Sequence, residues 1–226
     1  MIALDELPGG ARVRFTGRAE GDMGHAGEFV VDVRHDVASR RQSIADLPWT
    51  WLRQVHGDRV VRVGRPGERT GERADAAVTA ERGCALAVLS ADCAPVALVS
   101  SEGVVGAAHA GWAGVRAGVV EATVDAMRAL GADDIRAVLG PCIRSECYAF
   151  GADDLDSVAQ RLGPGVRGRT SDGRPALDLP AAVRSALQIS GVGDLRDTGV
   201  CTACTPAYFS WRARRDRGRQ VLVVWR

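Results

Sequence analysis

The chain has 226 residues, of which 46% are hydrophobic and 25% are charged, and this balance is typical of a soluble globular protein. The formal net charge of +1 gives no overall field that would attract nucleic acid. Every basic residue is an arginine, and the lack of lysine excludes Schiff-base chemistry, a pyridoxal cofactor and a lysine-dependent phosphate loop. Because no apolar run reaches the roughly 18 residues of a membrane span and no signal sequence is evident, we expect a cytoplasmic protein.

The predicted strands are short apolar runs that are rich in valine, isoleucine and leucine. Several are almost continuously apolar, which is typical of strands that are covered on both faces of a sheet. They span residues 28–34, 58–63, 84–90, 95–100, 103–109, 135–140 and 221–225.

Helical periodicity predicts helices over residues 115–130, 153–162 and 180–189. Gly131 is placed to cap the first of these helices, and Asp178 to start the last. Gly/Arg-rich stretches at 64–75 and 162–176 are predicted loops, and regular structure resumes after each. We therefore predict one α/β domain over residues 1–226, with two layers of strands and helices outside them.

Three potential metal ligands stand where predicted strands end. His56 precedes the glycine of QVHG, Cys93 lies in ADCAPV, and His109 comes before the turn of AAHAGWAG. Two imidazoles and one thiolate suit a catalytic zinc ion, because they leave a fourth position open for water. The alternative is two turn histidines and a small buried cysteine, since the three residues are too far apart in the chain to form a short ligand motif. His25 and His35, the other two histidines, are expected at the surface.

Six motifs occur in an order that resembles the YfiH-like laccase-domain family, also described as multicopper polyphenol oxidases. They are QVHG, ADAAVT (74–79), ADCAPV (91–96), HAGW, GPCI...CY (140–148) and CT......FSWR.....GRQ (201–220). The resemblance implies a layered α/β/β/α sandwich with mixed sheets, and a zinc site formed by His56, Cys93 and His109. It also implies phosphorolysis of purine nucleosides and adenosine deamination, and family members carry oxidase and peptidoglycan-editing labels as well.

The chain departs from the family pattern at positions near the expected site. Ala113 stands where an arginine follows HAGW, Ala149 stands where a glutamate follows CY, and Ser39 stands where an asparagine precedes the arginine, here Arg40. We therefore expect Arg116 and the start of the helix after HAGW to take over part of the phosphate binding. A four-copper oxidase is not expected, because the chain has only four histidines.

The remaining candidates have both functional and structural interpretations. Asp75 and Asp92 could orient a ligand or carry a proton, or they could cap turns. Planar arginine side chains suit phosphate, but most arginines of so Arg-rich a chain are solvated. Cys142, Cys147, Cys201 and Cys204 could hold a structural zinc ion, although buried free thiols explain them as well. The candidate phosphate-binding residues are Arg40, Arg116, Arg212 and Arg219, and the candidates for stacking on a purine are Trp112 and Phe209.

These observations favour a zinc enzyme, with copper as the alternative metal, that acts on a small purine nucleoside and phosphate. We expect a monomer or a weak homo-oligomer without nucleic-acid or membrane partners. A second hypothesis is a metal-free cysteine hydrolase for cell-wall precursors, with Cys93 as nucleophile and a histidine as base. A third is a binding protein on the same scaffold that has lost its activity.

Overall fold

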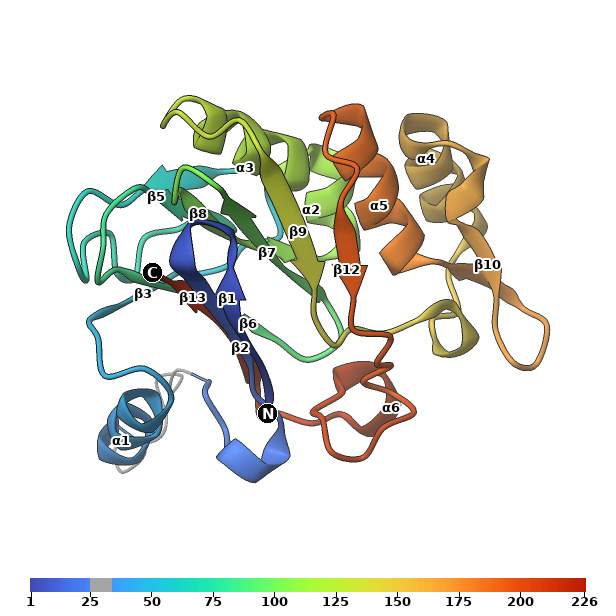
Figure 1. The fold of residues 1–226 in the computed structure, drawn as a ribbon. Coiled ribbons are helices and arrows are strands. Elements are labelled where there is room, and N and C mark those ends of the chain that lie inside the picture. Colours follow the sequence, from blue (N-terminus) through green and yellow to red (C-terminus); the bar gives the residue numbers. More distant parts are fainter. Residues whose placement is uncertain (25–33) are drawn as a thin grey trace.

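Two mixed β-sheets pack face to face in the computed structural model, which describes residues 1–24 and 34–226 (Figure 1). The five-stranded sheet has the order β1 (Ile2–Leu7), β2 (Ala11–Phe15), β13 (Gln220–Trp225), β6 (Ala85–Ser90) and β3 (Trp49–Trp51). The six-stranded sheet has the order β12 (Leu195–Asp197), β9 (Ile135–Leu139), β7 (Ala94–Ser100), β8 (Val105–Ala110), β5 (Ala76–Thr79) and β4 (Val60–Arg62). The pairs β3–β6, β4–β5 and β9–β12 are parallel and the other pairs are antiparallel.

The core between the sheets follows from the two-residue period of the strands. In β13, Leu222 and Val224 face the six-stranded sheet, whereas Val221 and Val223 face the opposite way. Both sets are buried, which explains why residues 221–225 of β13 are continuously apolar.

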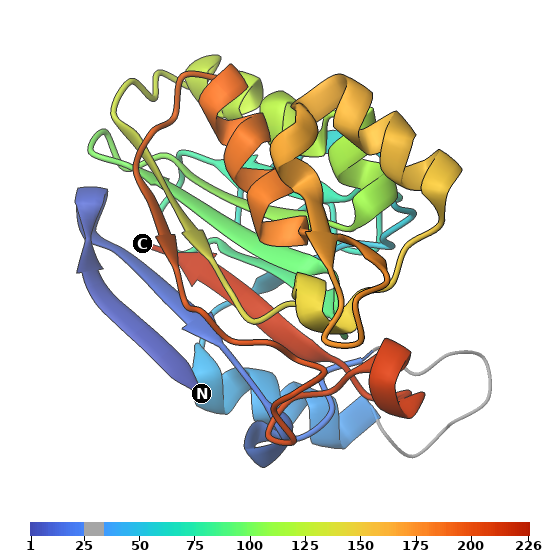
Figure 2. The same ribbon diagram turned by 90° about the vertical axis from the view of Figure 1, so that its right-hand side faces the viewer.

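Helices cover both outer faces of the sandwich (Figure 2). The outer face of the six-stranded sheet packs against α2 (Trp112–Ala117), α3 (Val119–Arg128), α4 (Ala152–Leu162) and α5 (Leu179–Ile189). The outer face of the five-stranded sheet is covered by α1 (Arg34–Ile44). This arrangement confirms the expected layered α/β/β/α sandwich with mixed sheets.

The smaller elements lie in the connections between the layers. They are the hairpin β10 (Arg167–Arg169) and β11 (Pro175–Leu177), the short helix α6 (Trp211–Arg214), and four 3-10 turns at Pro8–Gly10, Arg18–Glu20, Ser145–Cys147 and Pro164–Val166. Within residues 1–24 and 34–226, no helix combines the length and the apolar character needed to cross a bilayer.

Most predicted elements are present, with differences that have local causes. The predicted helix over 115–130 is two helices, α2 and α3, because Gly118 between them adopts a left-handed conformation with φ of 107°. Asp178 caps α5 as expected, accepting a hydrogen bond of 2.9 Å from the Ala181 N–H. The loop predicted over 162–176 contains strands of the β10–β11 hairpin. The predicted strand over 28–34, His25 and the side chain of His35 lie outside the described residues, except that Arg34 begins α1.

Gly140, which follows β9, provides a test of how closely the two sheets approach. A Cβ atom at this position would overlap the ring of Phe15, a fully buried residue of β2. We expect Gly140→Ala to lower the free energy of unfolding by roughly 1–3 kcal/mol, the usual cost of overpacking a core. Gly193→Ala is the control, because a Cβ there meets no atom within 4 Å. Chemical denaturation measures both, and equal stability of the two variants would contradict the close packing.

Candidate metal centre and cavity

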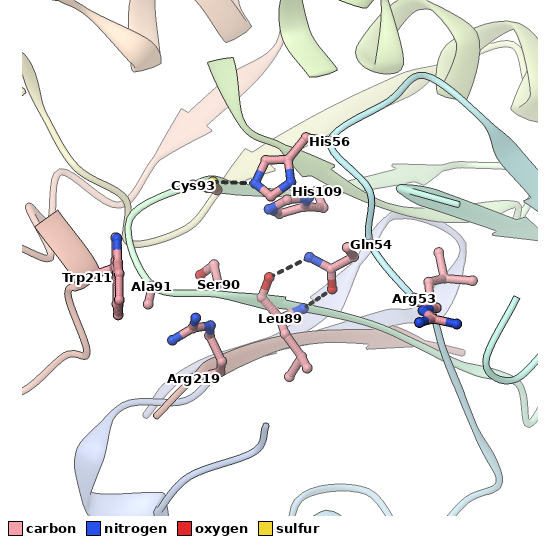
Figure 3. A pocket seen from close by; sticks show the side chains of 11 residues that line it. Arg53, Gln54, His56, Leu89, Ser90, Ala91, Cys93, His109, Trp211 and Arg219 are labelled. Atoms are coloured by element: carbon pink, nitrogen blue, oxygen red, sulfur yellow. Dashed lines mark hydrogen bonds between the residues drawn. The ribbon is translucent and has the colours of Figure 1, made fainter. Parts of the chain in front are cut away.

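His56, Cys93 and His109 converge from three separate segments, as the sequence predicts. His56 lies between β3 and β4, Cys93 directly precedes β7, and His109 lies near the end of β8. Their ligand atoms all lie within 4.8 Å of one another, and the Cys93 sulfur is 3.8 Å from Nε2 of His56 (Figure 3). Bonds of about 2.0–2.3 Å to one tetrahedral zinc ion would place such atoms about 3.3–3.8 Å apart. The three side chains therefore fit a shared metal ion.

The buried carboxylate of Asp75 organises the loop that carries His56. Asp75 has no exposed surface, and it accepts hydrogen bonds from the backbone N–H groups of Val55, His56 and Gly57 at 2.8–3.2 Å. These bonds hold His56 in a left-handed conformation, with φ of 59°, that a non-glycine residue rarely adopts. The loop is thus wrapped around one negative charge.

The same carboxylate contacts the second histidine. Oδ1 of Asp75 lies 2.9 Å from Nδ1 of His109, so Nε2 is the nitrogen of His109 that remains for a metal ion. Burial raises the pKa of Asp75, but the hydrogen bonds from His109 and Gly57 outweigh it and the net pKa is lowered. Asp75 is therefore ionised, and it contacts the ring of His109 and the backbone that carries His56.

Cys93 and His109 favour each other's charged forms. Burial would lower the pKa of His109, but the Cys93 thiolate and Asp75 outweigh burial and raise this pKa to about 9. Burial would raise the pKa of Cys93, but His109 and His56 lower it to about 6. A thiolate at neutral pH is the form of cysteine that binds metals and acts as a nucleophile.

Close packing around Gly111 explains why a glycine stands two residues after His109. A Cβ atom at this position would lie 2.9 Å from Cδ2 of His56 and 3.0 Å from the Cys93 sulfur. Only glycine lets the backbone at the start of α2 pass so close to these two side chains. The glycine of HAGW is therefore part of the site.

A cavity of about 560 Å³ opens beside the three potential ligands (Figure 3). Gln54 is fixed in it by two hydrogen bonds of 2.8 Å to the backbone of Leu89. Ser90 also lines the cavity, and its buried hydroxyl has no hydrogen-bond partner among the described residues. Two arginines, Arg53 and Arg219, and the half-exposed indole of Trp211 complete a polar wall with one aromatic face.

The other predicted site residues do not line this cavity. Both carboxylate oxygens of Asp92 are engaged, by the Thr202 hydroxyl at 2.7 Å and the Arg212 N–H at 2.6 Å. The Arg212 guanidinium lies over the ring of Tyr148, at 5.1 Å from its centre. Asp92 therefore ties the segment after β12 to the segment that carries Cys93.

Two further arginines predicted to bind phosphate contact other parts of the chain. Arg40 donates a hydrogen bond to the carbonyl of Asp22. Arg116 lies over the ring of Trp112 and donates to the hydroxyl of Ser157 on α4. Among the four candidate arginines, only Arg219 lines the cavity. A phosphate role for Arg40, Arg116 and Arg212 stays a prediction.

Several residues of the cavity wall could not be recognised from the sequence alone. Arg53 immediately precedes QVHG, Gln54 is the first residue of that motif, and Trp211 lies within FSWR. Their positions in or beside recognisable motifs were the available signal. Trp112, predicted as a stacking candidate, instead packs edge-on against Phe150.

Comparison with known proteins identifies close relatives along nearly the whole chain. A purine nucleoside phosphorylase of Streptomyces coelicolor is 41% identical over 199 residues, which are 86% of this chain and 82% of the relative. A purine nucleoside phosphorylase of Corynebacterium glutamicum is 34% identical and covers 100% of this chain and 98% of its own.

Two solved structures share the fold of this chain over nearly its whole length. Protein NMB0706 of Neisseria meningitidis superposes with a TM-score of 0.84 at 28% identity, covering 99% of this chain and 98% of its own. YlmD of Geobacillus stearothermophilus has a TM-score of 0.81 at 30% identity, with 96% and 91% covered. The family model described as multi-copper polyphenol oxidoreductase laccase matches residues 15–226. The chain therefore belongs to this laccase-domain family.

Proposed function

We propose that this protein is a zinc-dependent purine nucleoside phosphorylase. The observation that carries the proposal is the convergence of His56, Cys93 and His109 at the wall of a cavity that also presents arginine and tryptophan. Relatives at 34–41% identity named purine nucleoside phosphorylase support the reaction class. Adenosine deamination at the same site is a second reaction to assay, because three protein ligands are also the ligand set of a hydrolytic zinc site.

The donor set suits zinc better than a multicopper centre. His56, Cys93 and His109 would hold the ion, and Asp75 would keep the His109 ring in the required orientation. When bound, zinc supplies Lewis acidity next to the cavity. A blue-copper centre with a trinuclear cluster needs many more imidazoles than the four histidines of this chain. A single copper ion remains the alternative metal.

The cavity wall offers groups for both substrates. Arg219 and Arg53 would bind inorganic phosphate, because guanidinium groups match phosphate oxygens in a planar fork. The Ser90 hydroxyl would donate a further hydrogen bond, and Trp211 would stack on the purine. In the reaction, a phosphate oxygen bonds to C1′ of the ribose as the bond from C1′ to the purine nitrogen breaks. The purine takes the electron pair and a proton.

A metal-free cysteine hydrolase is the second candidate. It is favoured by the contact of 3.8 Å between the Cys93 sulfur and His56, and by a Cys93 pKa lowered to about 6. The two candidates differ in their dependence on metal and on phosphate.

Replacing Cys93 by serine tests the metal ligand. We expect Cys93→Ser to lose the zinc of this site, because a serine hydroxyl stays protonated where a thiolate binds the metal. Release of free base and ribose 1-phosphate from inosine should fall by at least about 100-fold. Cys84→Ala is the control, since Cys84 lies in the core between the sheets. Full zinc content in Cys93→Ser, or activity of the parent protein without metal, would favour the hydrolase.

Asp75→Asn tests whether Asp75 orients the ligands. The amide keeps the shape but loses the charge that the His109 contact and three backbone N–H groups require. We expect the Kd for zinc to rise by roughly 10- to 100-fold, as for other partners of ligand histidines. Asp58→Asn, in the same loop and exposed, should bind zinc like the parent. A variant with a lower melting temperature but an unchanged Kd would make Asp75 a purely structural residue.

Arg219→Ala tests the location of phosphate. We expect the KM for phosphate to rise roughly 10- to 100-fold, the loss of one charge-assisted hydrogen bond, with little change in the KM for nucleoside. Arg217→Ala is the matched control, because Arg217 is an exposed arginine two positions away. Arg116→Ala tests the other predicted location. If only the Arg116 variant changes the KM for phosphate, phosphate binds beside α2 rather than in the cavity.

A further inference from the structure

A second cluster of metal-binding side chains lies outside the cavity. Potential ligand atoms of Glu146, Cys147, Cys201 and Cys204 all lie within 4.8 Å of one another, and we call these four residues the thiol cluster. The sulfurs of Cys147 and Cys204 are 3.0 Å apart, and the Cys204 sulfur is 3.9 Å from Oε1 of Glu146. All three cysteines are free thiols. A carboxylate among three thiols is not explained by apolar packing.

Backbone contacts join the two segments that supply the thiol cluster. Cys142 and Cys201 form a parallel bridge, in which the Cys142 N–H donates to the Val200 carbonyl at 3.2 Å and the Thr202 N–H donates to the Cys142 carbonyl at 3.0 Å. The cluster thus combines the 3-10 turn at Ser145–Cys147 with the turn at 201–204. Backbone hydrogen bonds thus hold segments more than 50 residues apart in register.

Arginines hold the two turns in place. Arg144 makes two hydrogen bonds of 3.0 and 2.8 Å with the carboxylate of Asp197. Arg214 donates to the carbonyls of Thr202 and Ala203 at 2.9 and 2.8 Å. The turn at 201–204 is thereby fixed, and positive charges stand beside a cluster that would become anionic on metal binding.

We propose that Cys147, Cys201, Cys204 and Glu146 bind a second, structural zinc ion. Three thiolates and one carboxylate fill the four positions of a tetrahedral site and leave none open for substrate. Zn–S bonds of about 2.3 Å require the sulfurs of Cys147 and Cys204 to move apart from 3.0 Å to about 3.8 Å. Binding replaces the thiol protons by the metal ion, so up to three protons pass to the solvent for each ion bound. This proposal is independent of the function proposed for the cavity.

The composition of the thiol cluster favours a metal ion over a disulfide. A disulfide would use only two of the three sulfurs, and would leave the third sulfur and the carboxylate of Glu146 unexplained.

The thiol cluster would fix the segment that closes the cavity. Thr202, between two of its cysteines, donates to Asp92 beside Cys93, and the Arg212 N–H donates to the same carboxylate. Trp211, which lines the cavity, is the neighbour of Arg212. An ion in the thiol cluster therefore stabilises the connection between the turn at 201–204 and the cavity wall.

Zinc stoichiometry of purified, reduced protein tests the proposal. We expect two zinc ions per parent chain, one in Cys93→Ser, one in Cys204→Ser, and none in the double variant. Cys84→Ala should keep both ions. Glu146→Gln should fold and should raise the Kd for the second ion at least about 10-fold, which is the smallest usual effect of losing even an outer partner of a metal. With excess zinc, the melting temperature of the parent should rise more than that of Cys204→Ser.

The outcomes separate this site from the cavity site. A parent chain that holds one ion, lost in Cys204→Ser and kept in Cys93→Ser, supports the thiol cluster and removes the metal from the proposed function. One ion that is kept in Cys204→Ser and Glu146→Gln overturns the second site. Mass spectrometry showing a Cys147–Cys204 disulfide in protein purified without reductant, with no zinc taken up after reduction, overturns it as well.

Discussion

The site depends on one buried negative charge. Asp75 directly precedes β5, has no contact with solvent, and is compensated by three backbone N–H groups and the ring of His109. A buried carboxylate without such partners would cost several kcal/mol, so the loop around it has little freedom to rearrange. The position of His56 and the orientation of His109 are therefore consequences of a single charge that must be satisfied.

A second carboxylate, that of Asp92, fixes the position of a later part of the chain through hydrogen bonds. Asp92 adopts φ of 107° and accepts bonds from Thr202 and from the Arg212 backbone. It thus joins the turn before β7 to residues more than 100 positions later. The cavity is formed where these two carboxylate-centred networks meet, which explains why its walls come from so many parts of the sequence.

The grouping of three potential metal ligands could be predicted from sequence, whereas most of the cavity wall could not. His56, Cys93 and His109 lie in specific motifs at strand ends. These motifs can be recognised without knowing the path of the chain between them. Arg116 and Arg219 look equivalent in sequence, and only the packing of α2 against α4 turns the first toward Ser157. The break at Gly118 was missed because a helical pattern of apolar residues continues across it. The β1–β2 hairpin was also missed, although Ala11, Val13 and Phe15 alternate with arginines in the manner of a half-buried strand.

The position of β13 has a consequence for how the molecule assembles. This strand follows every other strand in the sequence, yet it lies in the interior of its sheet, between β2 and β6. During synthesis, the edge of β2 and the edge of β6 that pair with β13 therefore stay unpaired until residues 220–225 leave the ribosome. Pairing across about 200 residues is slow, since the loop must close before the contacts form. Until then, one edge of β2 and one edge of β6 are open to association with other chains.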